Sequence, residues 1–114
     1  MNILIILNDP PYGTERSFNG LRMAKALSQS DIHITVFLMA DAVVCAKKGQ
    51  KVPQGFYNIE LMLNSVLRNG EVLLCGTCMD ARGVTDEETI EGTQRSTMKE
   101  LAQRTRDAEK VLVF

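Results

Sequence analysis

The sequence lacks an excess of charge of either sign. Lysine and arginine number 13, aspartate and glutamate number 14, and the formal net charge is −1. Proteins that bind the phosphate backbone of nucleic acids carry clustered positive charge. We therefore expect no direct binding to DNA.

Long hydrophobic runs and targeting signals are also missing. No apolar run approaches the roughly 20 residues needed to cross a bilayer, and the segment Met1–Pro11 has neither basic residues nor an Ala-x-Ala cleavage site. Three cysteines, an odd number, cannot all pair within the chain and fit a reducing compartment. We expect no membrane association and a cytoplasmic location.

Potential metal ligands are too few for a closed zinc site, which takes about four nitrogen or sulfur ligands. The chain offers Cys45, Cys75, Cys78 and a single histidine, His33, and has no second Cys-x-x-Cys pair. It also has no complete phosphate-binding glycine motif. We expect no metal and no cofactor, and interpret His33 as a partly exposed strand residue and Cys45 as a buried apolar thiol.

What the sequence does contain is an alternation of strands and helices. A chain of 114 residues is expected to form one domain over residues 1–114. Apolar runs predict strands at 2–8, 33–39, 71–76 and 110–114, and helical patterns lie at 16–28, 41–49, 57–69 and 95–108. Residues 50–58, with little apolar content, predict a mobile loop. The alternation indicates an α/β protein with a mainly parallel sheet covered on both faces.

Two loops that follow strands carry unusual chemistry, Asp9–Glu15 and Gly76–Thr85. The carboxyl ends of parallel strands meet at one edge of a sheet, where ligands bind. We therefore expect these two loops to face the same crevice.

The second loop belongs to the segment Cys-Gly-Thr-Cys-Met-Asp-Ala-Arg-Gly-Val-Thr-Asp-Glu-Glu, residues 75–88. Its Cys-x-x-Cys spacing is typical of dithiol redox proteins, in which a helix begins directly at the pair. Here the helix-start signal, a Thr-x-x-Glu capping box, comes only at Thr85. This predicts a loop over 79–83 and disfavours a redox pair.

A single working thiol at Cys75 is an alternative. Gly76 and Gly83 would let backbone N–H groups turn toward its sulfur, and Arg82 would add positive charge, both of which lower a thiol pKa from about 8.5. Cys75 could equally fill the end of the strand while Arg82 is solvated. The residues alone leave these readings open.

Taken together, the motifs resemble the DsrE/TusD (DsrE/DsrF-like) family of small sulfur-transfer proteins. The likeness rests on Pro10-x-Tyr12-Gly13-Thr14 after the first strand, on residues 75–88, and on the closing Val-Leu-Val-Phe. The resemblance implies a three-layer α/β/α sandwich with a mainly parallel sheet of about four to five strands. It also implies assembly into trimers or hexamers, and a cysteine that accepts sulfane sulfur as a persulfide and relays it to other sulfur-relay proteins.

The resemblance also suggests site residues. Counting back from Arg82-Gly83 places the family's reactive cysteine at Cys75, while Cys78 departs from the pattern and would be an auxiliary or resolving thiol. Arg82, Gly83, Tyr12 and Thr14 are expected to shape the site. The leading hypothesis is a cytoplasmic sulfurtransferase or sulfur carrier; the alternatives are a Cys-x-x-Cys thiol–disulfide redox protein and a non-catalytic oligomeric binding protein.

Overall fold

A five-stranded parallel sheet forms the centre of the fold in the computed structural model, which describes residues 1–114. The strands are β1 (Asn2–Leu7), β2 (His33–Leu38), β3 (Glu71–Cys75), β4 (Gln94–Ser96) and β5 (Lys110–Val113). Their order is β4-β3-β2-β1-β5, and every neighbouring pair is parallel. The predicted mainly parallel sheet is confirmed.

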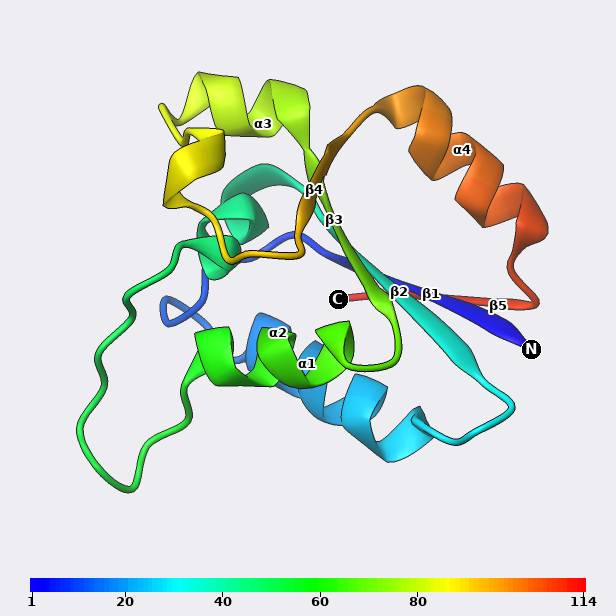
Figure 1. Cartoon of the computed structure of the whole chain (residues 1–114), viewed down its shortest axis with the longest axis horizontal. Coiled ribbons are helices and arrows are strands. Elements are labelled where there is room, and N and C mark those ends of the chain that lie inside the picture. The colour runs from blue at the N-terminus through cyan, green and yellow to red at the C-terminus, as the bar shows by residue number, and fades with distance from the viewer.

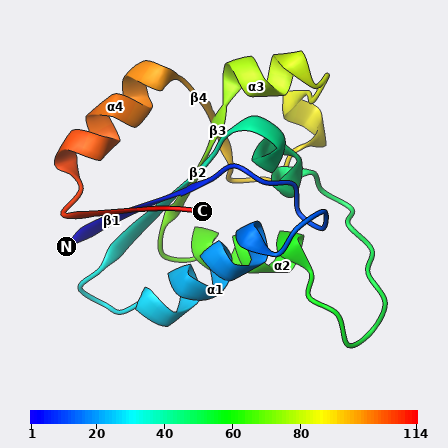
Figure 2. The same ribbon diagram turned by 180° about the vertical axis from the view of Figure 1, so that it is seen from behind.

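Helices cover both faces of this sheet (Figures 1 and 2). The helices α1 (Arg16–Leu27) and α2 (Ile59–Leu67) lie side by side on one face, and α3 (Gly76–Ala81) and α4 (Met98–Asp107) lie on the other. Two 3₁₀ helices, η1 (Ala40–Ala46) and η2 (Asp86–Glu88), complete the structure. This is the α/β/α sandwich that the resemblance implied.

The strand order explains the positions of α1, α2 and α4. The chain moves in one direction from β1 through β2 to β3, so right-handed crossovers place α1 and α2 on the same face. After β4 the chain returns across the whole sheet to β5 at the opposite edge, and α4 therefore covers the other face.

The hydrophobic core consists of 24 buried residues, most of them on β1, β2, β3 and η1. Strand β2 is buried at all but its first residue, as expected for a central strand with helices on both faces. No helix of the structure has both the length and the apolar character that a bilayer crossing requires.

Two short elements differ from the sequence-based expectation. Residues 94–96 form the edge strand β4, where a helix was predicted to begin at Arg95; that helix, α4, begins only at Met98. The polar Gln-Arg-Ser sequence carries no strand pattern, and its pairing with β3 is what makes it a strand. The second difference, α3, concerns the candidate site directly.

Candidate functional site

Cys75 is the last residue of β3 and lies at the carboxyl edge of the sheet. Strand β3 is flanked by β2 and β4, and Cys75 is aligned with Ser96 of β4. These neighbours and the helices leave the Cys75 side chain only 8% exposed. Cys78 is half-buried, and neither cysteine forms a disulfide.

A helix begins directly after Cys75, contrary to the predicted loop. Helix α3 spans Gly76–Ala81, and Cys75 is its N-cap: the backbone N–H of Cys78 donates to Cys75 Sγ at 3.4 Å. The thiol thus takes the place of the usual Ser, Thr, Asp or Asn side chain. The argument against a redox pair, which relied on a delayed helix start, is therefore wrong.

The end of α3 gives Arg82-Gly83-Val84 a structural role. Val84 N–H donates to Met79 O at 2.9 Å and Gly83 N–H donates to Asp80 O at 3.2 Å, the two bonds of a Schellman motif. Gly83 has φ +64°, the left-handed conformation that glycine adopts without steric cost. The predicted capping box at Thr85 is present, but it opens only the short η2.

Arg82 does not supply a free positive charge to the thiol. Its Nε donates to Asp41 Oδ1 at 2.8 Å and its Nη1 donates to Cys78 O at 3.2 Å. Arg82 therefore fastens α3 to η1, which is a site-shaping role, while its charge is balanced by Asp41. The helix expected at 41–49 is the shorter η1, and its N-cap is Met39.

The pKa of Cys75 moves in the direction opposite to the expectation. Burial raises the pKa of this thiol, and its hydrogen bond with the Cys78 side chain raises it further. The backbone N–H groups of Cys78 and Thr77 act in the other direction but do not outweigh these effects. Cys75 is accordingly a protonated thiol at neutral pH and not a thiolate.

Arg95 is a residue of the site that the sequence analysis missed. From β4 its Nη1 donates to Gly76 O at 3.1 Å and to Asp80 Oδ1 at 3.0 Å, and its Nε donates to Asp86 Oδ1 at 3.1 Å. A Cβ on residue 76 would lie 3.1 Å from Arg95 Cγ, which shows how closely this arginine crosses the start of α3. Arg95 thereby fixes α3, which carries Cys78 and is capped by Cys75.

Tyr12 and Thr14 form no hydrogen bond with Cys75 or Cys78. Tyr12 Oη donates to Gln50 Oε1 at 2.6 Å and accepts from Ile59 N at 3.1 Å, so it fastens the long loop before α2. Thr14 Oγ1 donates to Asp9 Oδ2 at 2.7 Å at the start of α1.

No hydrogen bond or ion pair joins residues 9–15 to residues 75–85. The segment that contains η1 lies between the two loops: Cys45 contacts Asp9 on one side, and Asp41 binds Arg82 on the other. The two loops are therefore linked through η1 and not by a direct hydrogen bond or ion pair.

Cys45 is confirmed as a buried thiol. It is 0% exposed, its Sγ donates to Asp9 O at 3.6 Å, and burial raises its pKa to about 12.

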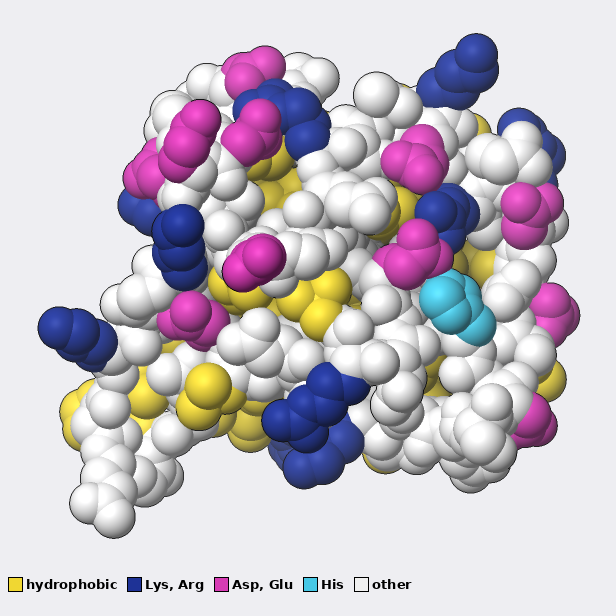
Figure 3. Space-filling model, viewed as in Figure 1, with side chains coloured by type: hydrophobic (Ala, Val, Ile, Leu, Met, Phe, Trp, Pro, Cys, Tyr) yellow, Lys and Arg dark blue, Asp and Glu magenta, His cyan; other side chains and the backbone are white.

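No three histidine, cysteine, aspartate or glutamate side chains gather closely enough to hold a metal ion. Acidic and basic side chains are interspersed over the face shown in Figure 3.

Comparison with known proteins identifies the family. The sequence matches the DsrE/DsrF-like family over residues 1–114. The chain belongs to this family. Protein YchN of Escherichia coli K12 is 45% identical over 115 aligned residues, which cover 98% of this chain and 97% of YchN. An uncharacterized protein of Methanocaldococcus jannaschii is 32% identical over 114 residues, the full length of both chains.

Solved structures share the fold of this chain. The crystal structure of the E. coli YchN protein matches with a TM-score of 0.92 at 45% identity, over 100% of this chain and 99% of that chain. The protein of unknown function MTH1491 from Methanobacterium thermoautotrophicum matches with a TM-score of 0.78 at 12% identity, over 99% and 97% of the two chains, and shares the fold.

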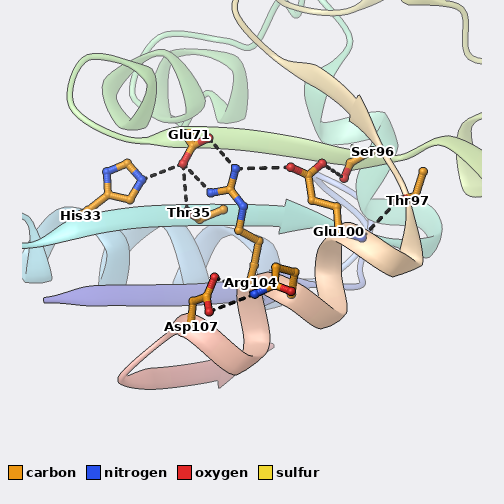
Figure 4. A network of polar contacts seen from close by, with 9 residues as sticks. His33, Thr35, Glu71, Ser96, Thr97, Glu100, Arg104 and Asp107 are labelled. Atoms are coloured by element: carbon orange, nitrogen blue, oxygen red, sulfur yellow. Dashed lines mark hydrogen bonds and ion pairs between the residues drawn. The ribbon is translucent and has the colours of Figure 1, made fainter.

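A second polar cluster lies at the opposite end of the sheet in this DsrE/DsrF-like chain (Figure 4). Glu71, the first residue of β3, accepts from Arg104 of α4 at 2.6 and 2.9 Å, and its Oε2 lies 2.7 Å from His33 Nε2. Arg104 also pairs with Glu100, which accepts from Ser96. This cluster joins α4 to the starts of β2 and β3, and confirms His33 as a partly exposed strand residue.

Proposed function

We propose that this protein is a sulfur carrier of the sulfurtransferase type, which accepts sulfane sulfur as a cysteine persulfide and passes it to a partner. One observation carries the proposal: the two free cysteines of the family's sulfur-transfer segment lie together at the carboxyl end of β3, where the Cys78 N–H donates to Cys75 Sγ. A backbone N–H directed at a sulfur stabilises its anionic form. The Arg82 and Arg95 contacts hold this arrangement rigid.

Sulfur uptake from a rhodanese tests the proposal. The reduced protein is mixed with one equivalent of rhodanese in its persulfide form, and intact masses are recorded. We expect this protein to gain one sulfur atom or to show the products of its onward reaction. A Cys75→Ser/Cys78→Ser double variant should show neither, and Cys45→Ser, the matched control, should behave as the unaltered chain. If the double variant takes up sulfur as well as the unaltered chain does, the proposal is wrong.

A dithiol redox function is the second candidate, and a specific observation favours it. Helix α3 starts immediately after Cys75, so the pair has the strand-end and helix-start placement typical of Cys-x-x-Cys oxidoreductases. This candidate predicts a reversible intramolecular disulfide and disulfide-reductase activity that needs both thiols. Catalytic reduction of a small disulfide without any sulfur uptake would favour it over sulfur transfer.

We also propose that copies of the chain associate into a trimer or hexamer in the cytoplasm and exchange sulfur with other relay proteins. An open groove between α1 and α2 supports the association, because Met23, Phe56 and Leu61 at this groove are 42%, 70% and 64% exposed. Exposed apolar surface of this kind is typical of protein–protein contacts. Light scattering should show an oligomer that Leu61→Glu weakens, whereas a monomer at all concentrations would contradict the association.

A further inference from the structure

The two thiols of the pair differ in their access to solvent. Cys75 belongs to the hydrophobic core and is 8% exposed, whereas Cys78 is half-buried and only packs against that core. A sulfur donor of protein size approaches from outside, so it meets Cys78 first. The more accessible thiol is therefore Cys78, whereas the resemblance to the family placed the accepting thiol at Cys75.

The geometry of α3 places the two sulfurs next to each other. Cys75 is the N-cap and Cys78 is the third residue of the helix, and side chains of a helix lean toward its N-terminus. The Cys78 side chain therefore leans back over the Cys75 sulfur. The backbone N–H of Cys78 donates to Cys75 Sγ at 3.4 Å, so the Cys75 sulfur lies directly beside residue 78.

Neither sulfur has another protein thiol to react with. Cys45 lies on η1, is fully buried and hydrogen-bonds to Asp9 O. A persulfide on Cys78 would present two sulfurs: an inner one beside Cys75 and an outer one extending away from the pair. Attack by Cys75 is therefore directed at the inner sulfur.

Building on the proposed function, we propose that Cys78 accepts the sulfane sulfur and that Cys75 resolves the persulfide, releasing sulfide and leaving a Cys75–Cys78 disulfide. The Cys75 sulfur forms a bond to the Cys78 sulfur, and the bond between the Cys78 sulfur and the outer sulfur breaks. The outer sulfur leaves with the bonding electron pair. The leaving sulfur takes up one proton, which balances the proton that Cys75 loses. Cys78–S–SH and Cys75–SH thus give the disulfide and H₂S.

This reaction oxidises the two cysteine sulfurs and reduces the outer sulfur from sulfane to sulfide. A dithiol reductant must then supply two electrons to reopen the disulfide by thiol–disulfide exchange. The resolving step needs the Cys75 thiolate, so below the pKa of this thiol its rate rises about tenfold per pH unit. The raised pKa of Cys75 gives a partner time to collect the persulfide before it is resolved.

A single-turnover experiment tests the assignment of the two thiols. The reduced protein, freed of reductant, receives one equivalent of persulfide-loaded rhodanese, and an electrode follows sulfide while mass spectrometry follows the protein. The unaltered chain should release about one equivalent of sulfide and end two hydrogens lighter, with a disulfide between residues 75 and 78.

The variants should separate the roles. Cys75→Ser, whose serine can still cap α3, should keep the added sulfur on Cys78 and release no sulfide. Cys78→Ser should take up sulfur at least tenfold more slowly, and Cys45→Ser should match the unaltered chain. Circular dichroism of each variant checks the fold, and Cys75→Ala provides a second test that does not depend on serine.

Three outcomes would overturn the inference. A stable persulfide on the unaltered chain, with neither disulfide nor sulfide, excludes resolution by Cys75. Unchanged uptake by Cys78→Ser excludes Cys78 as the accepting thiol. Absence of both sulfur uptake and sulfide release in the unaltered chain refutes the proposed function itself, so the two failures can be distinguished.

Discussion

The Glu71 carboxylate stabilises the fold only while it is ionised, and this can be tested by acid. Arg104 donates to both of its oxygens, and His33 Nε2 lies 2.7 Å from Oε2. The hydrogen bonds from Arg104 are the largest cause that lowers the pKa of Glu71 from 4.5 to about 2, with burial opposing them. Protonation of Glu71, or its replacement by glutamine, removes the charge on which these contacts depend.

The size of the effect follows from this pKa. Because the pKa is lower in the folded state, the stabilisation is fully present above about pH 4.5 and is lost as the pH falls toward about 2. A pKa lowered this far corresponds to about 3 kcal/mol at most. The Glu71 and Arg104 side chains are 31% and 29% exposed, so solvent screens the pair and we expect about 1 to 2 kcal/mol.

Denaturant unfolding of Glu71→Gln at two pH values measures this contribution. At pH 7 the variant should unfold with about 1 to 2 kcal/mol less free energy than the unaltered chain, and near pH 2 to 3 the difference should shrink. Glu91→Gln, at an exposed residue with no ion pair, serves as the control. Equal stability at pH 7, or a difference that does not change with pH, would refute the reasoning.

Three further predictions concern the thiols and the turns. Iodoacetamide should modify Cys78 before Cys75 and leave Cys45 unmodified in the folded protein, because Cys45 is fully buried with its pKa raised to about 12; rapid labelling of Cys45, seen by peptide mass spectrometry, would contradict this. Gly83→Ala should lower the free energy of unfolding by about 1 kcal/mol because alanine is strained at φ +64°. Gly83→Asn should lower it by less. Equal stability of the unaltered chain and both variants in urea would disprove this prediction. Tyr12→Phe should speed hydrogen exchange at the Ile59 amide several-fold, since that N–H loses its acceptor; unchanged exchange there would argue against the contact.

The larger elements of the fold could be predicted from the sequence because their apolar runs are long. Strands β1, β2, β3 and β5 lie within one residue of their expected bounds, since three of them pass through the core and must be continuously apolar. Strand β4 could not be predicted, because its three residues carry no pattern of their own and are held by pairing with β3.

The candidate site was predictable only in part. The cysteine pair and its position at a strand end followed from local sequence, but the start of α3 is capped by a thiol, which is not among the usual capping residues. The Gly83-Val84 end of a Schellman motif was the signal that could have revealed this helix. The most distant partners of Arg82 and Arg95, Asp41 and Gly76, lie 41 and 19 residues away and cannot be obtained from spacing.

The location of the transferred sulfur tests the central claim most directly. Tryptic cleavage after Arg68 and Arg82 places Cys75 and Cys78 in one peptide, 69–82, and cleavage after Lys25 and Lys47 places Cys45 in another, 26–47. After exposure to persulfide-loaded rhodanese, we expect the added sulfur, or the disulfide that follows it, in peptide 69–82 alone. Sulfur found on the Cys45 peptide, or on neither peptide, would contradict the assignment of sulfur transfer to the Cys75–Cys78 pair.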